Sequence, residues 1–144
     1  MPRIKIDLPG QFHFSTLLPV RITDVNYGGH VGNDTILSLI HEARMQYLHH
    51  FGYTELNLGG AGLIMSDVGI EFKSELFYGD TVKASVAIAE LSKISFELYY
   101  KLEKEVNGKT ILVAVAKTGM VCFDYEKKKV IAIPDEVRNK LATI

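Results

Sequence analysis

The sequence predicts an α+β fold in which four or five long antiparallel strands form a sheet that curves around one apolar helix. Two patterns support this prediction. Apolar residues recur every three or four positions over residues 33–51, and from Leu63 onward they recur at every second position. A helix followed by a run of strands is the order typical of α+β proteins. The 144 residues show no repeat or linker-like change of composition, so we expect one domain over residues 1–144.

The first strand is expected at residues 12–22, and Pro19 within it favours an edge of the sheet. The helix is predicted over residues 33–51, with Asn33 or Asp34 capping its first turn. Its apolar band is wide, so we expect the helix to be covered on most sides. The band comprises Ile36, Leu37, Leu39, Ile40, Ala43, Tyr47, Leu48 and Phe51.

The later part of the chain is predicted to be mostly strand. The expected strands are 63–74, 80–91, 94–103 and 110–123, with a short edge strand at 127–133. Asn107-Gly108 favours a type I′ hairpin turn between the third and fourth of these. Apolar residues fill both faces of 110–123, which predicts the central strand of the sheet. Pro134 suits the first turn of a C-terminal helix.

Composition argues against several classes of protein. With 16 Lys and Arg against 17 Asp and Glu, the net charge is -1, and the short 127–129 lysine run resembles a hairpin tip more than a nucleic-acid site. Cys122 is the one cysteine, so neither an internal disulfide nor a cysteine metal framework is expected. No apolar run reaches the ~18 residues of a membrane span and the N-terminus lacks a signal-peptide pattern, so we expect a cytoplasmic protein without membrane partners.

Polar residues gather where the first strand is expected to end and the helix to begin. Asp24, Asn26 and His30 are two and four residues apart on a glycine-bearing turn, and Glu42 follows within the helix. A helix N-terminus presents free N–H groups and partial positive charge, which stabilise a developing negative charge. The segment therefore offers groups for proton transfer beside a site for an anionic oxygen.

The order and motifs of the chain resemble those of hotdog-fold thioesterases, specifically the 4-hydroxybenzoyl-CoA thioesterase-like family. The resemblance covers most of the chain and rests on PVRITDVNYGGHVGN at residues 19–33, HEAR at 41–44 and FYGD at 77–80. It implies a long antiparallel sheet wrapped around a central helix, and hydrolysis of a thioester of coenzyme A or of acyl carrier protein. It also implies a homodimer with a continuous sheet, often paired into a homotetramer, with active sites between subunits. Coenzyme A enters as part of the substrate, and no metal or redox cofactor is indicated.

The same resemblance suggests catalytic roles. The family's carboxylate usually lies four residues before the His of the motif, where this chain has Asn26. An amide neither accepts a proton usefully near neutral pH nor forms an acyl anhydride. Asp24, at the family's first acidic position, or Glu42, at the position of its helix carboxylate, is therefore the expected general base. On an alternating strand end, Asp24 would share a face with Asn26. Asn26 and His30 would orient water or substrate.

Substrate-binding roles follow from position. Backbone N–H groups near Gly32, Asn33 and Asp34 would hold the oxyanion. Ser66 interrupts an apolar strand and would line the acyl pocket, and Lys73 would contact coenzyme A phosphates.

Each role has a structural alternative. Asp24 can cap the turn, His30 can be a hydrogen-bonded residue at the helix entrance, and Glu42 can be solvated. Asn33 can cap the helix, and Arg44 can pair with an acidic residue across an interface.

Two other functions stay open beside thioester hydrolysis. Asn26 at the usual carboxylate position is compatible with a non-catalytic acyl-binding protein. A hotdog hydratase carries an Asp-x-Asn-Pro-x-His motif similar to Asp24-Val25-Asn26, but here the proline is missing and His30 lies one residue further along. An assay of thioester cleavage distinguishes a thioesterase from a non-catalytic binding protein. Hydration of a trans-2-enoyl thioester would identify a hydratase.

Overall fold

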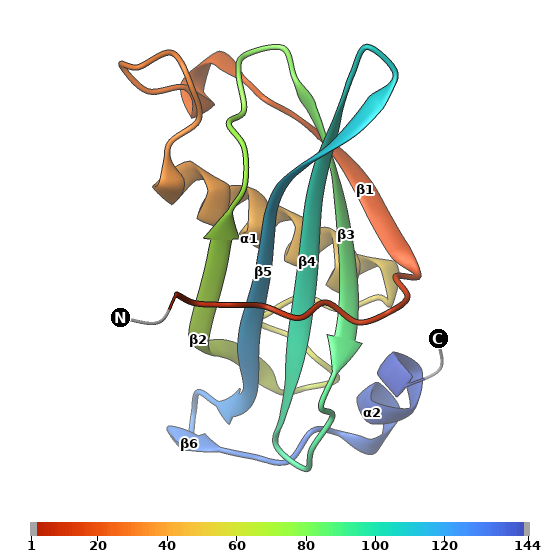
Figure 1. Cartoon of the computed structure of the whole chain (residues 1–144). Coiled ribbons are helices and arrows are strands. Elements are labelled where there is room, and N and C mark those ends of the chain that lie inside the picture. Colours follow the sequence, from red (N-terminus) through yellow and green to blue (C-terminus); the bar gives the residue numbers. More distant parts are fainter. Residues whose placement is uncertain (1–2, 143–144) are drawn as a thin grey trace.

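The structure, a computed structural model, describes residues 3–142 and confirms the α+β arrangement (Figure 1). The elements in chain order are β1 (Phe14–Pro19), the short 3-10 helix η1 (Ile22–Asp24), α1 (Asn33–His50), β2 (Gly62–Phe72), β3 (Thr81–Ala89), β4 (Ser95–Val106), β5 (Lys109–Asp124), β6 (Lys129–Val130) and α2 (Asp135–Ala142). Each predicted strand is present, although β1 is shorter than residues 12–22 because the chain turns into η1.

The strands form one sheet in the order β1-β3-β4-β5-β2, with every neighbouring pair antiparallel and β6 paired to the end of β5. Pro19 accordingly lies in an edge strand, as expected. The prediction that residues 110–123 form the central strand was wrong, because β4 occupies that place. Burial on both faces distinguishes an interior strand from an edge, but β5, between β4 and β2, satisfies that condition without being central.

Local patterns located the β4–β5 hairpin correctly. Asn107 and Gly108 have φ values of 53° and 78°, as a type I′ turn requires. Along β4, every second side chain is buried against α1, namely Phe96, Leu98, Tyr100 and Leu102. The alternation therefore reports the face of the sheet that carries the core.

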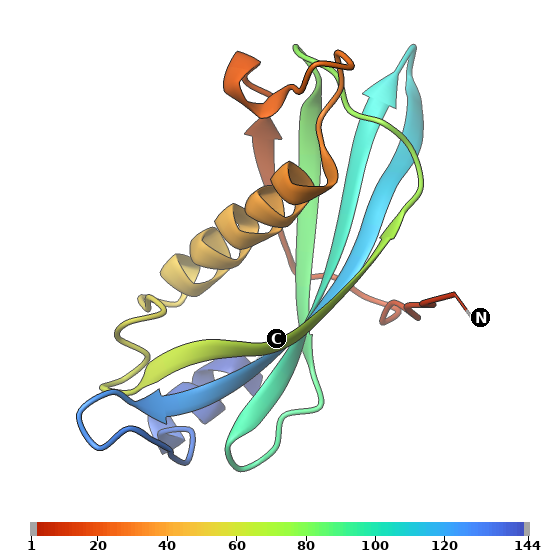
Figure 2. The ribbon, with the colours of Figure 1, turned by 90° about the vertical axis from the view of Figure 1, so that its left-hand side faces the viewer.

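Helix α1 lies across one face of the strongly twisted sheet (Figure 2). Its buried residues form one stripe, comprising Ile36, Leu39, Ile40, Ala43, Arg44, Tyr47 and Leu48. The opposite side, which includes His41, Glu42 and His49, is exposed. Within one protomer the helix is thus covered on one side, and Leu37 and Phe51 at the margins of the stripe are half-buried.

The N-terminal segment crosses the other face of the sheet (Figures 1 and 2). The Ile6 N–H donates to the Glu71 carboxylate at 2.5 Å, and the Lys101 ammonium lies 4.9 Å from the centre of the Phe12 ring. At the other end of the chain, α2 follows Pro134 and buries Val137 and Leu141. The last two residues of the predicted C-terminal helix lie outside the described residues. No helix among residues 3–142 is long and apolar enough to cross a membrane.

Replacement of Leu48 tests the packing of α1 on the sheet. Leu48 is fully buried, so Leu48→Ala should lower the free energy of unfolding by about 2–5 kcal/mol through lost contacts and a residual cavity. The exposed neighbour is the control, and His49→Ala should change it by less than about 0.5 kcal/mol. Urea unfolding of both variants measures the difference, and equal midpoints would contradict this packing.

Candidate functional site

The turn between η1 and α1 is closed by its own backbone. Val25 and Val31 form an isolated antiparallel bridge, and the Asn26 N–H donates to the His30 carbonyl at 3.0 Å. The Gly29 N–H donates back to the Asn26 carbonyl at 3.1 Å, with Gly29 at φ +81°, a conformation that favours glycine. The Tyr27-Gly28-Gly29 sequence thus makes a tight loop that fixes Asn26 and His30 at its two ends.

The side chains of Asn26 and His30 converge over Gly28. Asn26 Oδ1 accepts the Gly28 N–H at 2.9 Å, and a Cβ placed on Gly28 would lie 3.3 Å from both Asn26 Oδ1 and His30 Nε2. His30 Nδ1 lies 3.2 Å from the Val31 carbonyl, which assigns the ring proton to Nδ1. Nε2 then keeps a free lone pair, and it lies 4.0 Å from Glu75 Oε1. The half-buried imidazole is therefore poised to accept a proton.

The entrance of α1 joins the same cluster. Gly32 is the N-cap residue and no side chain caps the first turn among the described residues, so the prediction that Asn33 or Asp34 caps it was wrong. A Cβ on Gly32 would lie 2.8 Å from Asp34 Oδ1 and 3.5 Å from Asn26 Nδ2. The free N–H groups of the first turn of α1 therefore lie next to the Asn26 amide and the exposed Asp34 carboxylate.

Asp24 has a different environment from the one predicted. It lies in η1 rather than on a strand end, so it does not share a strand face with Asn26, and its side chain is buried at 7% exposure. Its Oδ2 accepts the Arg21 N–H at 2.8 Å, and its Oδ1 lies 3.3 Å from the Arg21 guanidinium. Burial raises the pKa of Asp24, but these hydrogen bonds and the guanidinium charge outweigh burial, and the net pKa is lowered. By binding Arg21, the Asp24 carboxylate therefore stabilises the backbone of η1, which leads into the turn.

Glu42 lies apart from the turn. It is exposed and accepts a hydrogen bond from Gln46 Nε2 at 2.7 Å. It is nine residues beyond the start of α1, which corresponds to about 14 Å along the helix axis. One protomer does not bring this carboxylate to Asn26 or His30.

Ser66 and Lys73 also direct their polar contacts elsewhere. Ser66 lies at a bulge in β2, where its hydroxyl lies 3.2 Å from the Gly119 carbonyl and 3.1 Å from Asp67 Oδ1. The Lys73 ammonium pairs with Glu71 at 3.0 Å. Neither makes a polar contact with the turn in the described part of the chain.

The structure adds a buried polar network that the sequence did not predict. Arg44, 4% exposed, donates from Nε to Glu55 at 3.3 Å and from its guanidinium to the Tyr100 hydroxyl at 3.3 Å. The Tyr100 hydroxyl lies 2.7 Å from the Thr118 hydroxyl, and His41 Nε2 lies 2.6 Å from Glu55. The acidic partner of Arg44 in the described chain is therefore Glu55 of the same protomer. Glu55 belongs to a turn-rich connection that gave no signal of this role.

The site contains candidate proton carriers and hydrogen-bond donors but no described metal centre. Among residues 3–142, no three His, Cys, Asp or Glu side chains are arranged to hold a metal ion. Glu75, next to His30, was also missed from the sequence, since 45 positions separate the two residues. No pattern in the sequence relates them.

Known proteins share both the sequence pattern and the fold. Residues 20–141 match the model of the thioesterase-like superfamily. The chain is 29% identical over 125 residues to a 1,4-dihydroxy-2-naphthoyl-CoA hydrolase of Microcystis aeruginosa, covering 85% of this chain and 88% of that protein.

Solved structures give the same picture. A 1,4-dihydroxy-2-naphthoyl-CoA thioesterase from Synechocystis has a TM-score of 0.80 at 22% identity, covering 91% of this chain and 96% of the other. An Asp-to-Asn mutant of 4-hydroxybenzoyl-CoA thioesterase, complexed with 4-hydroxybenzoyl-CoA, has a TM-score of 0.81 at 18% identity and covers 90% and 98%. With the family pattern spanning η1, both helices and all strands except β1, the chain belongs to the thioesterase-like superfamily and has the hotdog fold.

Proposed function

We propose that this protein hydrolyses acyl-coenzyme A thioesters at the turn between η1 and α1, and that its acyl group is aromatic. The convergence of Asn26 and His30 beside the open N-terminus of α1 carries this proposal. The family supports thioester hydrolysis, and the similar proteins named for naphthoyl and hydroxybenzoyl substrates support an aromatic acyl group. Because those proteins act on coenzyme A esters, coenzyme A is favoured over acyl carrier protein as the thiol carrier.

His30 is the proposed general base. Its Nε2 accepts a proton as water attacks the thioester carbonyl, and the imidazolium then protonates the departing thiolate when the carbon–sulfur bond breaks. The Glu75 carboxylate, 4.0 Å away, stabilises the imidazolium between these steps. Asp24 is a weaker candidate because Arg21 occupies its oxygens and lowers its pKa.

Two sources of hydrogen bonds are proposed for the oxyanion. One is the group of free N–H donors in the first turn of α1, where the helix dipole also favours negative charge. The other is Asn26 Nδ2, which lies next to that turn. In this arrangement Asn26 donates a hydrogen bond to the oxyanion. It therefore has a different role from the carboxylate that the family usually has at this position, which acts as base or nucleophile.

A homodimer formed through β2 is proposed to complete the site. The turn is exposed in one protomer, and β2 is an edge strand without a partner on its outer side in the described sheet. Met65, Val68 and Phe72 on β2 are 39%, 38% and 48% exposed, and their register opposite β5 places all three on the helix side of the sheet. Pairing of two β2 edges would cover this apolar strip. Further pairing into a tetramer stays a prediction.

Binding without hydrolysis is the second candidate function. Asn26 at the family's carboxylate position favours it, and one similar structure is an Asp-to-Asn mutant that holds its thioester substrate. Release of free thiol from aromatic acyl-CoA esters separates the two functions. Binding of these esters without thiol release would establish the second.

Substitutions at three titratable groups test the assignment of the base. His30→Gln should lower kcat for an aromatic acyl-CoA about 10²–10⁴-fold, because the proton acceptor is lost. Asp34→Asn and Glu42→Gln are matched neutral substitutions that should retain kcat within about 10-fold, since a nearby charge contributes less than the base itself. Thiol release under saturating substrate is the measurement. If Asp34→Asn or Glu42→Gln abolished turnover while His30→Gln did not, the base would be a carboxylate.

Asp24→Asn tests the structural role of this carboxylate. Loss of charged hydrogen bonds to Arg21 should lower the free energy of unfolding by about 1–3 kcal/mol at neutral pH. Because the folded-state pKa of Asp24 is lowered, its contribution is present above the unfolded pKa and disappears as the pH falls through the folded pKa. The difference between wild type and variant, measured by urea unfolding, should therefore shrink below about pH 4. A difference that stayed constant down to pH 3 would contradict this role.

A charge on β2 tests the dimer. Val68→Asp should shift the protein toward monomer in analytical ultracentrifugation, because an unpaired carboxylate would be buried between the two edges. Val106→Asp is the matched control, since Val106 is also 38% exposed but lies at the β4–β5 hairpin. Monomeric wild-type protein, or equal behaviour of the two variants, would exclude the β2 dimer.

A further inference from the structure

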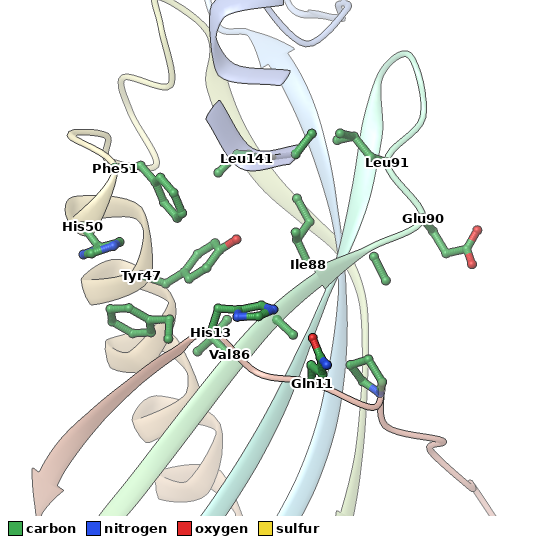
Figure 3. A pocket seen from close by; sticks show the side chains of 15 residues that line it. Gln11, His13, Tyr47, His50, Phe51, Val86, Ile88, Glu90, Leu91 and Leu141 are labelled. Carbon is green, nitrogen blue, oxygen red and sulfur yellow. The ribbon is translucent and has the colours of Figure 1, made fainter. Parts of the chain in front are cut away.

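A cavity of about 510 Å³ lies toward the opposite end of α1 from the turn (Figure 3). The pairing of β3 with β1 ends at Val86, but β3 itself continues to Ala89. The edge of residues 87–89, which β1 leaves uncovered, forms one wall of the cavity. Tyr47 lies 14 residues beyond Asn33, which corresponds to about 21 Å along the helix axis. The cavity is therefore separate from the site proposed for hydrolysis.

The cavity has an apolar interior and a polar mouth. Val86, Leu141 and Tyr47 are buried at its floor, with exposures of 1%, 0% and 1%. Half-buried Phe14, Phe51, Ile88 and Leu91 form the walls, and exposed Gln11, His13, His50 and Glu90 lie at the mouth. This volume and this distribution of polar groups are typical of small-molecule sites.

Tyr47 supplies a polar group at the floor that lacks a partner. Its hydroxyl is buried and has no hydrogen-bond partner among the described residues. The ring is held edge-on by Phe14 and Phe51, with centroid distances of 5.6 and 5.2 Å, and Figure 3 shows the hydroxyl pointing among the lining residues toward Ile88. Burial raises the pKa of Tyr47, so the phenol stays protonated and able to donate. Buried hydroxyls are nearly always paired in folded proteins, which makes this one a candidate ligand contact.

We propose that this cavity is a second ligand site, which binds a hydroxylated aromatic carboxylic acid of one or two rings. The ring packs among Phe14, Phe51 and Ile88, and its hydroxyl pairs with Tyr47. The carboxylate lies at the mouth, where His13 and Gln11 offer N–H donors. Glu90, the one acidic residue among those that line the cavity, also lies at the mouth, but its carboxylate points away from the cavity in Figure 3, which weakens its repulsion of an anion there.

Such an acid is the product that hydrolysis of a hydroxylated aromatic acyl-CoA releases, and this assignment as product rests on the proposed function. The cavity and its orphan hydroxyl do not depend on it. A larger cavity, of about 730 Å³, is lined mainly by charged and exposed residues such as Lys83 and Glu105. Its buried polar residue, Lys104, is already paired with the Glu75 carbonyl and the Asp80 carboxylate, so no ligand is needed to satisfy it.

Calorimetric binding of matched acids tests the proposal without any turnover. The probes are 4-hydroxybenzoate against benzoate, and 6-hydroxy-2-naphthoate against 2-naphthoate. In wild type, at least one hydroxylated acid should bind about 5- to 10-fold more tightly than its parent, as expected for one added hydrogen bond. Tyr47→Phe should remove this advantage while leaving kcat unchanged. Tyr53→Phe is the control, because the Tyr53 hydroxyl is likewise buried and unpaired in the described chain but lines a neighbouring cavity of about 600 Å³ instead of this one.

The outcomes are distinct. Binding at the proposed active site would be the same in both Phe variants, so only a difference specific to Tyr47→Phe reports the cavity. No binding, or a hydroxyl advantage that survives Tyr47→Phe, would overturn the proposal, and thermal unfolding checks that each variant is folded. If the acids bind in a Tyr47-dependent way but the protein releases no thiol from acyl-CoA esters, the cavity is a ligand site. Its ligand is then not a product of this protein.

Discussion

The packing of the apolar stripe of α1 against the inner face of the sheet positions everything else in this molecule. Ile40, Ala43 and Leu48 are fully buried there, in the same core cluster as Leu98 of β4. Burial of such side chains is the main favourable term in folding, and it fixes the axis of the helix relative to the strands. The polar turn consequently lies at one end of the sheet and the apolar cavity toward the other.

The two ends of α1 differ in chemistry because their neighbours differ. At the N-terminus, a glycine-rich loop closed by backbone hydrogen bonds leaves His30, Asn26 and the first-turn N–H groups accessible. Toward the C-terminus, the start of β1 and helix α2 leave a space lined by aromatic and aliphatic side chains around the Tyr47 hydroxyl. One helix thus serves a site suited to proton transfer and a separate site suited to holding an aromatic molecule.

Asn26 distinguishes this chain from the family pattern, and its contacts suggest why hydrolysis need not be lost. The amide oxygen accepts a backbone N–H within the turn, and the amide nitrogen faces the helix entrance. It can therefore orient the loop and donate to an oxyanion, while the imidazole of His30 takes the proton. Asp24 is hydrogen-bonded to Arg21, so its proposed role is to stabilise the residues before this loop and not to take part in the reaction.

The sequence alone determined the elements and their buried faces, because periodicity reports the local environment of a helix or strand. It located the helix, the hairpin at Asn107-Gly108 and the turn that carries Asn26 and His30. Only the tertiary structure decided that β4 is central, that Glu75 lies beside His30 and that Glu55 neutralises Arg44. It also revealed the cavity around Tyr47. These features depend on residues distant in sequence, whose proximity is set by the path of the chain and by packing between elements.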